Sequence, residues 1–171
     1  MSDWSNLKWT DADEQLVKLW FSPEHLSGLF EPGRNTHEIS WGRPLGSKLH
    51  EMREPMFWVH GVSLFDKVET FLDEEGWRQV SKILEKSGYR TIRVTTFGSS
   101  IAEEISRAVE KWARGGEAAL LQTATIFSFP IRPEVPWSDV EALMAGFAEK
   151  YGRNFEFEVL DRGLEVIPST S

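Results

Sequence analysis

The stretch Thr-Thr-Phe-Gly-Ser-Ser-Ile at residues 95–101 carries residue types that could bind a small anion. Gly98, Ser99 and Ser100 stand where a predicted strand ends and a predicted helix begins. Free backbone N–H groups and hydroxyls at such a position can hold a phosphate or a carboxylate. The stretch matches neither the phosphate-binding loop nor the dinucleotide-binding pattern, and no lysine follows it. A capped helix start explains the same residues without a ligand, so both interpretations stay open.

No group of residues has the spacing of a catalytic or metal centre. The histidines do not recur at metal-ligand intervals; they are His25, His37, His50 and His60. The chain has no Gly-x-Ser-x-Gly nucleophile turn. It also has no cysteine, which excludes thiolate metal sites, disulfides and cysteine nucleophiles. The sequence therefore predicts a non-enzymatic protein without a metal or a cofactor.

Residues 33–53 are locally basic in an otherwise acidic chain. The formal net charge is −8, which argues against a general affinity for nucleic acid. Any contact with DNA would therefore have to come from this local stretch. The side chains predicted to make it are Arg34, Arg43, Lys48, His50 and Arg53.

The N-terminus holds two tryptophans in a polar surrounding, Trp4 and Trp9. An exposed indole buries a large area against a partner, so both are predicted as protein-interface anchors. The alternative is that they fold back onto the body of the protein.

Three helices are predicted before residue 54. Thr10 is a good helix cap, followed by an apolar face at Leu16, Val17 and Trp20. Ser22-Pro23 marks a second helix start. The third helix would lie between residues 36 and 52, where Pro44 and Gly46 interrupt it.

This N-terminal third resembles the Myb/SANT-type helix-turn-helix. The resemblance rests on Trp9-Thr10-Asp11, on Leu16 to Trp20, and on Gly33-Arg34-Asn35-Thr36 followed by Lys48-Leu49-His50. It implies a three-helix module that binds DNA or protein, with its third helix in the major groove. The sequence departs from the family pattern at Asn35 and at Pro44 with Gly46, so only the turn and the basic residues are carried over.

From residue 55 onward, strands and helices are predicted to alternate. The order is a strand at 56–62, a helical stretch from 63 or 66 to 88, a strand at 91–96, a helix from Ser100, a strand at 120–129, a helix from Ser138, and strands at 155–159 and 164–167. We expect an α+β protein in which a helical segment, 1–54, precedes an α/β domain, 55–171. That α/β body would hold a mixed sheet of about five strands with three helices. A ferredoxin-like split arrangement is the alternative.

Three functional hypotheses follow from these patterns. The chain shows neither a membrane-spanning run nor a signal peptide, so a cytoplasmic location without membrane contact is expected. The leading hypothesis is a binding or regulatory protein whose N-terminal module contacts DNA or a protein partner, while the α/β domain supplies a protein interface. The alternatives are an acidic inhibitor or immunity-type protein that masks a basic partner, and a domain that binds small anions.

Overall fold

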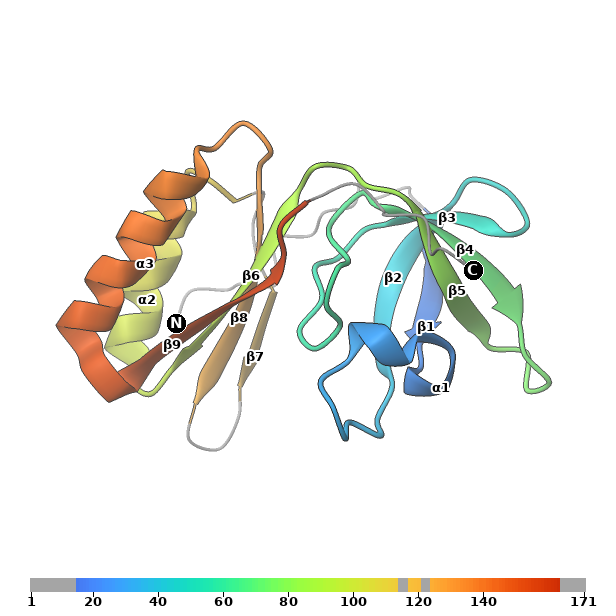
Figure 1. The fold of residues 1–171 in the computed structure, drawn as a ribbon, viewed down its shortest axis with the longest axis horizontal. Coiled ribbons are helices and arrows are strands. Elements are labelled where there is room, and N and C mark those ends of the chain that lie inside the picture. Colours follow the sequence, from blue (N-terminus) through green and yellow to red (C-terminus); the bar gives the residue numbers. More distant parts are fainter. Residues whose placement is uncertain (1–14, 114–116, 121–123, 164–171) are drawn as a thin grey trace.

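A computed structural model describes residues 15–113, 117–120 and 124–163. The described chain forms a closed five-stranded barrel followed by a four-stranded sheet, and helices α2 and α3 cover one face of that sheet (Figure 1). The predicted fold class and the Myb/SANT resemblance are therefore wrong, because residues 17–52 are mainly strands and contain no three-helix segment.

The barrel is a meander of consecutive strands. Each strand pairs antiparallel with the next, and β1 closes the barrel by pairing parallel with β5. The strands are β1 (Val17–Phe21), β2 (Glu38–Pro44), β3 (Leu49–Met52), β4 (Lys67–Leu72) and β5 (Arg78–Glu85). Between β1 and β2 lie the one-turn helix α1 (Pro23–Leu26) and the 3-10 turn η2 (Ser27–Leu29).

Strand periodicity prevails over the helical spacing expected at residues 16–20. Leu19 and Phe21 point into the barrel and are fully buried, whereas Trp20 between them faces outward. Five residues are too few to separate a helical from an alternating pattern, and the ladder with β2 decides between them. The helix start expected at Ser22-Pro23 is confirmed, but it yields only α1.

The helical stretch expected over 63–88 is also wrong, because β4 and β5 form a hairpin there. Its turn ends at Gly76, which has a φ of +83° that favours glycine. The strand expected at 56–62 is absent. Those residues belong to the connection between β3 and β4, residues 53–66, called here the linking segment. Pro55, the expected domain boundary, lies within this connection.

The second half of the chain follows the order strand, helix, strand, strand, helix, strand. Its strands are β6 (Arg90–Thr96), β7 (Glu117–Leu120), β8 (Thr125–Ile131) and β9 (Phe155–Asp161), arranged as β7-β8-β6-β9 with every pair antiparallel. This is the split arrangement named as the alternative above. A mixed sheet was expected, but β8 inserts between β6 and β7, so the crossover does not create a parallel pair.

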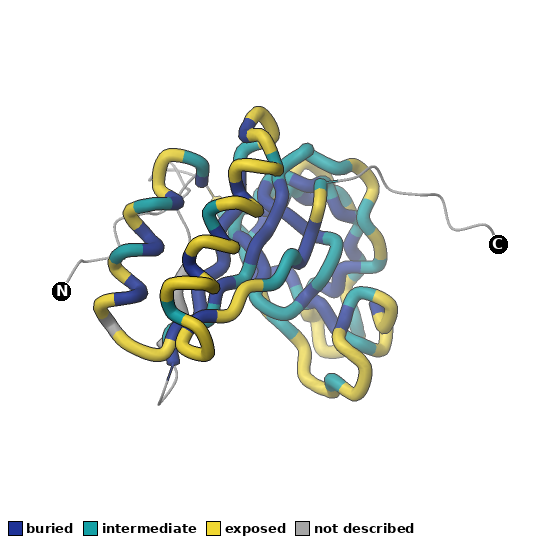
Figure 2. The backbone as a smooth tube through the Cα atoms, turned by 60° about the vertical axis from the view of Figure 1, so that its left-hand side comes forward, coloured by how far each residue is buried: buried dark blue, intermediate teal, exposed yellow. Residues whose placement is uncertain are grey.

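Helices α2 (Ser99–Val109) and α3 (Trp137–Tyr151) confirm the two amphipathic helices predicted here, and η3 (Gly152–Asn154) follows α3. Their inner faces are buried and their outer faces exposed (Figure 2). Ile105, Val109 and Met144 pack with Ile92 and Phe127 in one apolar cluster. The strands predicted at 91–96 and 155–159 are confirmed as β6 and β9, whereas residues 164–167 lie outside the described chain.

The linking segment lies on the sheet face opposite the helices. Arg93 of β6 and Ser128 of β8 are paired in the sheet. Arg93 Nη1 donates a hydrogen bond to the Phe57 carbonyl at 2.9 Å, and Ser128 Oγ donates to the Met56 carbonyl at 2.5 Å. These residues alternate with those facing the helices, so both sheet faces are covered.

Candidate functional site

An exposed aromatic stack stands at one end of the barrel. The rings of Trp20 and Trp77 are stacked with centroids 4.2 Å apart and planes 5° apart. The His37 ring lies 4.6 Å from that of Trp20. Trp77 is 44% exposed, a large fraction for a tryptophan in a folded domain. These three residues are called here the tryptophan platform.

The hairpin turn between β4 and β5 fixes Trp77. The Trp77 backbone N–H donates to Asp73 Oδ1 at 2.7 Å, and the Asp73 N–H donates to the Trp77 carbonyl at 3.0 Å. Gln79 Nε2 donates to Asp73 Oδ2 at 2.8 Å, and its other amide atom accepts from Ser22 Oγ at 2.6 Å. The hydrogen bond from Gln79 is the main reason that the pKa of Asp73 is lowered. Asp73 therefore stays ionised beside Trp77 at neutral pH.

Trp77 separates two hollows of different chemistry. One, of 410 Å³, is lined by Val17, Trp20, Leu72 and Trp77 together with the basic residues Lys18 and Arg78. The other, of 440 Å³, is lined by the acids Glu24, Asp73 and Glu75, together with His37 and Gln79. The arrangement offers an aromatic side chain bordered by a mixed apolar and basic hollow and by a hollow rich in carboxylates. It can hold a cationic side chain by ring and charge together.

The linking segment is fixed by a buried carboxylate of the barrel. Glu38 of β2 accepts hydrogen bonds from the backbone N–H groups of Phe57, Trp58 and Val59 at 2.7, 3.0 and 3.0 Å. Burial raises the pKa of Glu38 above its ordinary value, and these three hydrogen bonds oppose that shift.

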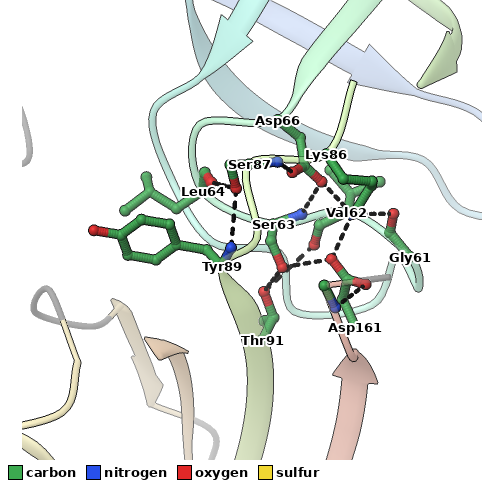
Figure 3. Close-up of polar contacts among 11 residues, drawn as sticks. Gly61, Val62, Ser63, Leu64, Asp66, Lys86, Ser87, Tyr89, Thr91 and Asp161 are labelled. Carbon is green, nitrogen blue, oxygen red and sulfur yellow. Dashed lines mark hydrogen bonds and ion pairs between the residues drawn. The ribbon is translucent and has the colours of Figure 1, made fainter. Parts of the chain in front are cut away.

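A second buried network joins the linking segment to β5 and the sheet (Figure 3). Lys86 forms ion pairs with Asp66 and with Asp161. Ser63 Oγ donates to Asp161 Oδ2 at 2.6 Å and lies 2.7 Å from the Thr91 hydroxyl. These side chains are nearly all inaccessible to solvent, so the network positions the barrel on the sheet.

The five predicted nucleic-acid contacts do not share a helix. Arg34 lies in the loop before β2 with its guanidinium over the Trp58 ring, and Arg43 of β2 pairs with Glu51. Lys48 is exposed before β3, whereas His50 is buried in β3. Arg53 lies near Glu51 and over the Phe65 ring. His50 Nδ1 lies 3.1 Å from the Thr70 hydroxyl, and its pKa is lowered first by burial and then by Arg78. A recognition helix carrying these residues is therefore absent from the described chain.

The other predicted sites are placed as follows. Gly98 precedes α2 with a φ of +135° and Ser100 is exposed in its first turn, so Gly98, Ser99 and Ser100 do stand at a helix start. No side chain caps that start, and the anion site stays a prediction. Trp4 and Trp9 lie outside the described residues.

Sequence reasoning missed the tryptophan platform. A turn signal was present in Asp73-Glu74-Glu75-Gly76, directly before Trp77. A helical stretch from 63 or 66 to 88 was expected over these residues, so an exposed Trp77 beside a hairpin turn was not anticipated.

The sequence matches the family described as a domain of unknown function (DUF4265) over residues 38–153. The chain belongs to the DUF4265 family. No curated protein matches it. A crystal structure of a hypothetical protein from Neisseria gonorrhoeae is similar, with a TM-score of 0.63 at 15% sequence identity, and the similarity covers 88% of this chain and 98% of that chain. At this identity the similarity shows a common fold.

The DUF4265 match begins at Glu38, so it includes Trp77 and His60 but not Trp20. Within the described residues, no helix has both the length and the apolar character needed to cross a membrane.

Proposed function

We propose that this DUF4265 protein is a non-enzymatic binding protein whose tryptophan platform holds a basic segment of a partner protein. One observation carries the proposal: Trp77 is exposed, stacks on Trp20, is hydrogen-bonded to Asp73 through its backbone N–H, and is bordered by a hollow rich in carboxylates. An exposed aromatic side chain that is already ordered loses little entropy on binding, as in other protein interfaces.

The chemistry around Trp77 favours a lysine or arginine side chain as the occupant. A cation over an indole ring contributes roughly 0.5–2 kcal/mol, depending on how far it is desolvated. Glu24, Asp73 and Glu75 line the adjoining hollow and would pair with that cation. Leu72, which is 59% exposed, offers apolar contact on the opposite side of Trp77.

The charge of the whole chain supports the same kind of partner. A net charge of −8 attracts a basic protein over long range and raises its association rate, and it repels nucleic acid. In the acidic-inhibitor hypothesis, the tryptophan platform is therefore the surface that would contact the basic partner.

Titration of the full chain with short blocked peptides tests the proposal. The probes are Arg-Leu-Arg and the charge-reversed Glu-Leu-Glu. Binding is followed by NMR through the indole N–H signal of Trp77 and, in the variant that lacks this ring, through the backbone N–H signals of the β4–β5 turn. We expect the basic peptide to bind with a dissociation constant of about 1 mM or tighter and the acidic peptide to leave the signal unmoved. Trp77→Ala should abolish binding. Phe157→Ala should not, although Phe157 is exposed to a similar extent, 39%, on β9.

A second measurement extends the test to the natural partner. Wild type, Trp77→Ala and Phe157→Ala are used as parallel baits in extracts of the host. A basic protein retained by wild type and Phe157→Ala but lost with Trp77→Ala agrees with the proposal. Equal retention by all three baits, or preferential binding of duplex DNA, would overturn it.

A further inference from the structure

A second group of chemically competent side chains lies where the barrel meets the sheet. Glu31 follows η2, His60 belongs to the linking segment, and Glu158 lies on β9. One potential ligand atom from each residue lies within 4.8 Å of the other two. A carboxylate, an imidazole and a second carboxylate form a set of oxygen and nitrogen ligands that suits divalent transition metals.

His60 supplies an independent indication of a ligand. Its Nε2 atom is buried and has no hydrogen-bond partner, although the side chain as a whole is 32% exposed. Glu158 Oε1 lies 3.6 Å away, beyond the range of a good hydrogen bond. Two ligands on one tetrahedral zinc ion, each about 2.0–2.2 Å from the metal, lie about 3.4 Å apart. The spacing therefore fits two atoms that share an ion better than two atoms that share a proton.

The backbone around His60 is fixed on both sides. The His60 N–H donates to the Leu29 carbonyl at 2.7 Å, which ties it to the barrel side next to Glu31. The Gly61 N–H donates to the Leu160 carbonyl at 2.8 Å, which ties the segment to β9 next to Glu158. The three ligands are thus held by elements that are already bonded to one another.

Arg93 lies beside the cluster and orients its carboxylates. Arg93 Nη2 binds Glu158 through Oε2 and Glu31 through Oε1, the latter at 3.1 Å. Glu158 Oε1 is therefore left facing His60. Hydrogen bonds of this kind to ligating carboxylates are common around metal ions. The cluster thus holds two carboxylates beside the one guanidinium of Arg93. Arg34 lies over the Trp58 ring at 4.1 Å, and Arg93 lies over the same ring at 4.8 Å.

We propose that Glu31, His60 and Glu158 bind one divalent transition-metal ion in a tetrahedral site of the kind that zinc prefers. His60 Nε2 and Glu158 Oε1 are the two principal ligands, and Glu31, whose side chain is 44% exposed, closes the site from the barrel side. Water completes the coordination. The ion links barrel and sheet, and its binding stabilises the folded chain by an amount that grows with the logarithm of the free metal concentration once that concentration exceeds the dissociation constant.

Calorimetric titration of the full chain, freed of any polyhistidine tag and treated with a chelator, tests the inference with zinc chloride as the probe. We expect one ion per chain with a dissociation constant of about 10 µM or tighter, and a higher melting temperature with zinc. Cobalt should give the visible absorption of a tetrahedral site.

Matched variants decide which residues hold the ion. His60→Ala and Glu158→Gln should each weaken zinc binding at least tenfold, and Glu31→Gln, at a more exposed position, should weaken it less. His25→Ala is the control, because His25 Nε2 lies 2.9 Å from Glu24 on the exposed helix α1.

The inference would be overturned if zinc binding were lost in His25→Ala but kept in the other variants. It would also be overturned if the single variants Glu31→Gln and Glu158→Gln both bound zinc as wild type does. Absence of binding at 100 µM zinc would do the same. Should His60→Ala fail to fold, His60→Gln and the two glutamate variants carry the test. The peptide titration at Trp77 is an independent readout, so either proposal can fail without the other.

Discussion

Lys86 Nζ lies 2.5 Å from Asp161 Oδ2, so the residue directly after barrel strand β5 is paired with the last residue of β9 in the sheet. Both side chains are only 6% exposed. Lys86 also pairs with the fully buried Asp66, so one ammonium group serves two carboxylates. The barrel and the sheet are therefore joined by charge as well as by backbone hydrogen bonds.

Replacing Lys86 by methionine should strongly destabilise the protein. Two buried carboxylates would lose their common cation, and breaking a buried ion pair on one side costs about 3–5 kcal/mol. Guanidinium unfolding measures the loss. Lys67→Met is the control, because the Lys67–Glu85 pair is exposed and should be worth no more than about 1 kcal/mol. Similar small losses in both variants would contradict the structural role given to Lys86.

The pH dependence of stability should reveal the buried Glu38. Because burial raises its pKa in the folded state above the ordinary value of 4.5, the folded chain holds this proton more tightly than the unfolded chain. Its contribution to stability is thus present below that value and is lost as the pH rises through the folded pKa. The stability of wild type relative to Glu38→Gln should decrease from pH 4.5 toward neutrality. Urea unfolding of both proteins across that pH range measures their free energies of unfolding. A stability of wild type relative to Glu38→Gln that increases with pH would contradict the prediction.

Gly163→Ala should destabilise the chain by about 1–3 kcal/mol. Gly163 has a φ of +68°, and a Cβ atom built there would lie 2.8 Å from the Gly88 carbonyl oxygen. Backbone atoms cannot move aside as a flexible side chain can. Gly46→Ala is the control, since its Cβ would meet no atom within 4 Å. Thermal unfolding compares the two, and equal melting temperatures would show that the turn tolerates a side chain.

Charge reversal beside the tryptophan platform should weaken binding of a basic peptide. Glu75→Lys places a cation in the acidic hollow, and we expect affinity for Arg-Leu-Arg to fall at least about fivefold, with less effect at high salt. Glu149→Lys on the exposed side of α3 changes the net charge equally at a distant place. If both variants weaken binding alike, only overall charge matters and the hollow has no specific role.

The sequence by itself determined those helices and strands in which an apolar pattern repeats over several turns or several alternating positions. The apolar stripe of Ile101, Ile105 and Val109 extends over three turns, so helix α2 could be recognised without its partners. The alternation in β9 was likewise clear from Phe155 to Val159. Short strands gave no such signal, and Trp77, Val80, Ile83 and Leu84 have helical spacing although a hairpin contains them.

What only the tertiary structure decided is which distant residues meet. Glu31, His60 and Glu158 are separated by 29 and 98 positions along the chain, so no ligand spacing could indicate them. Trp20 stacks on Trp77 because β1 closes the barrel against β5, a pairing between the first and last strands that no local pattern encodes. Local periodicity and turn residues can be recognised from residues close in sequence, and they were sufficient to predict α2, α3, β6 and β9. Barrel closure depends on hydrogen bonds between segments far apart in sequence, and it decided the tryptophan platform. The hydrogen bonds of the linking segment to Leu29 and to Leu160 of β9 decided the Glu31, His60 and Glu158 cluster.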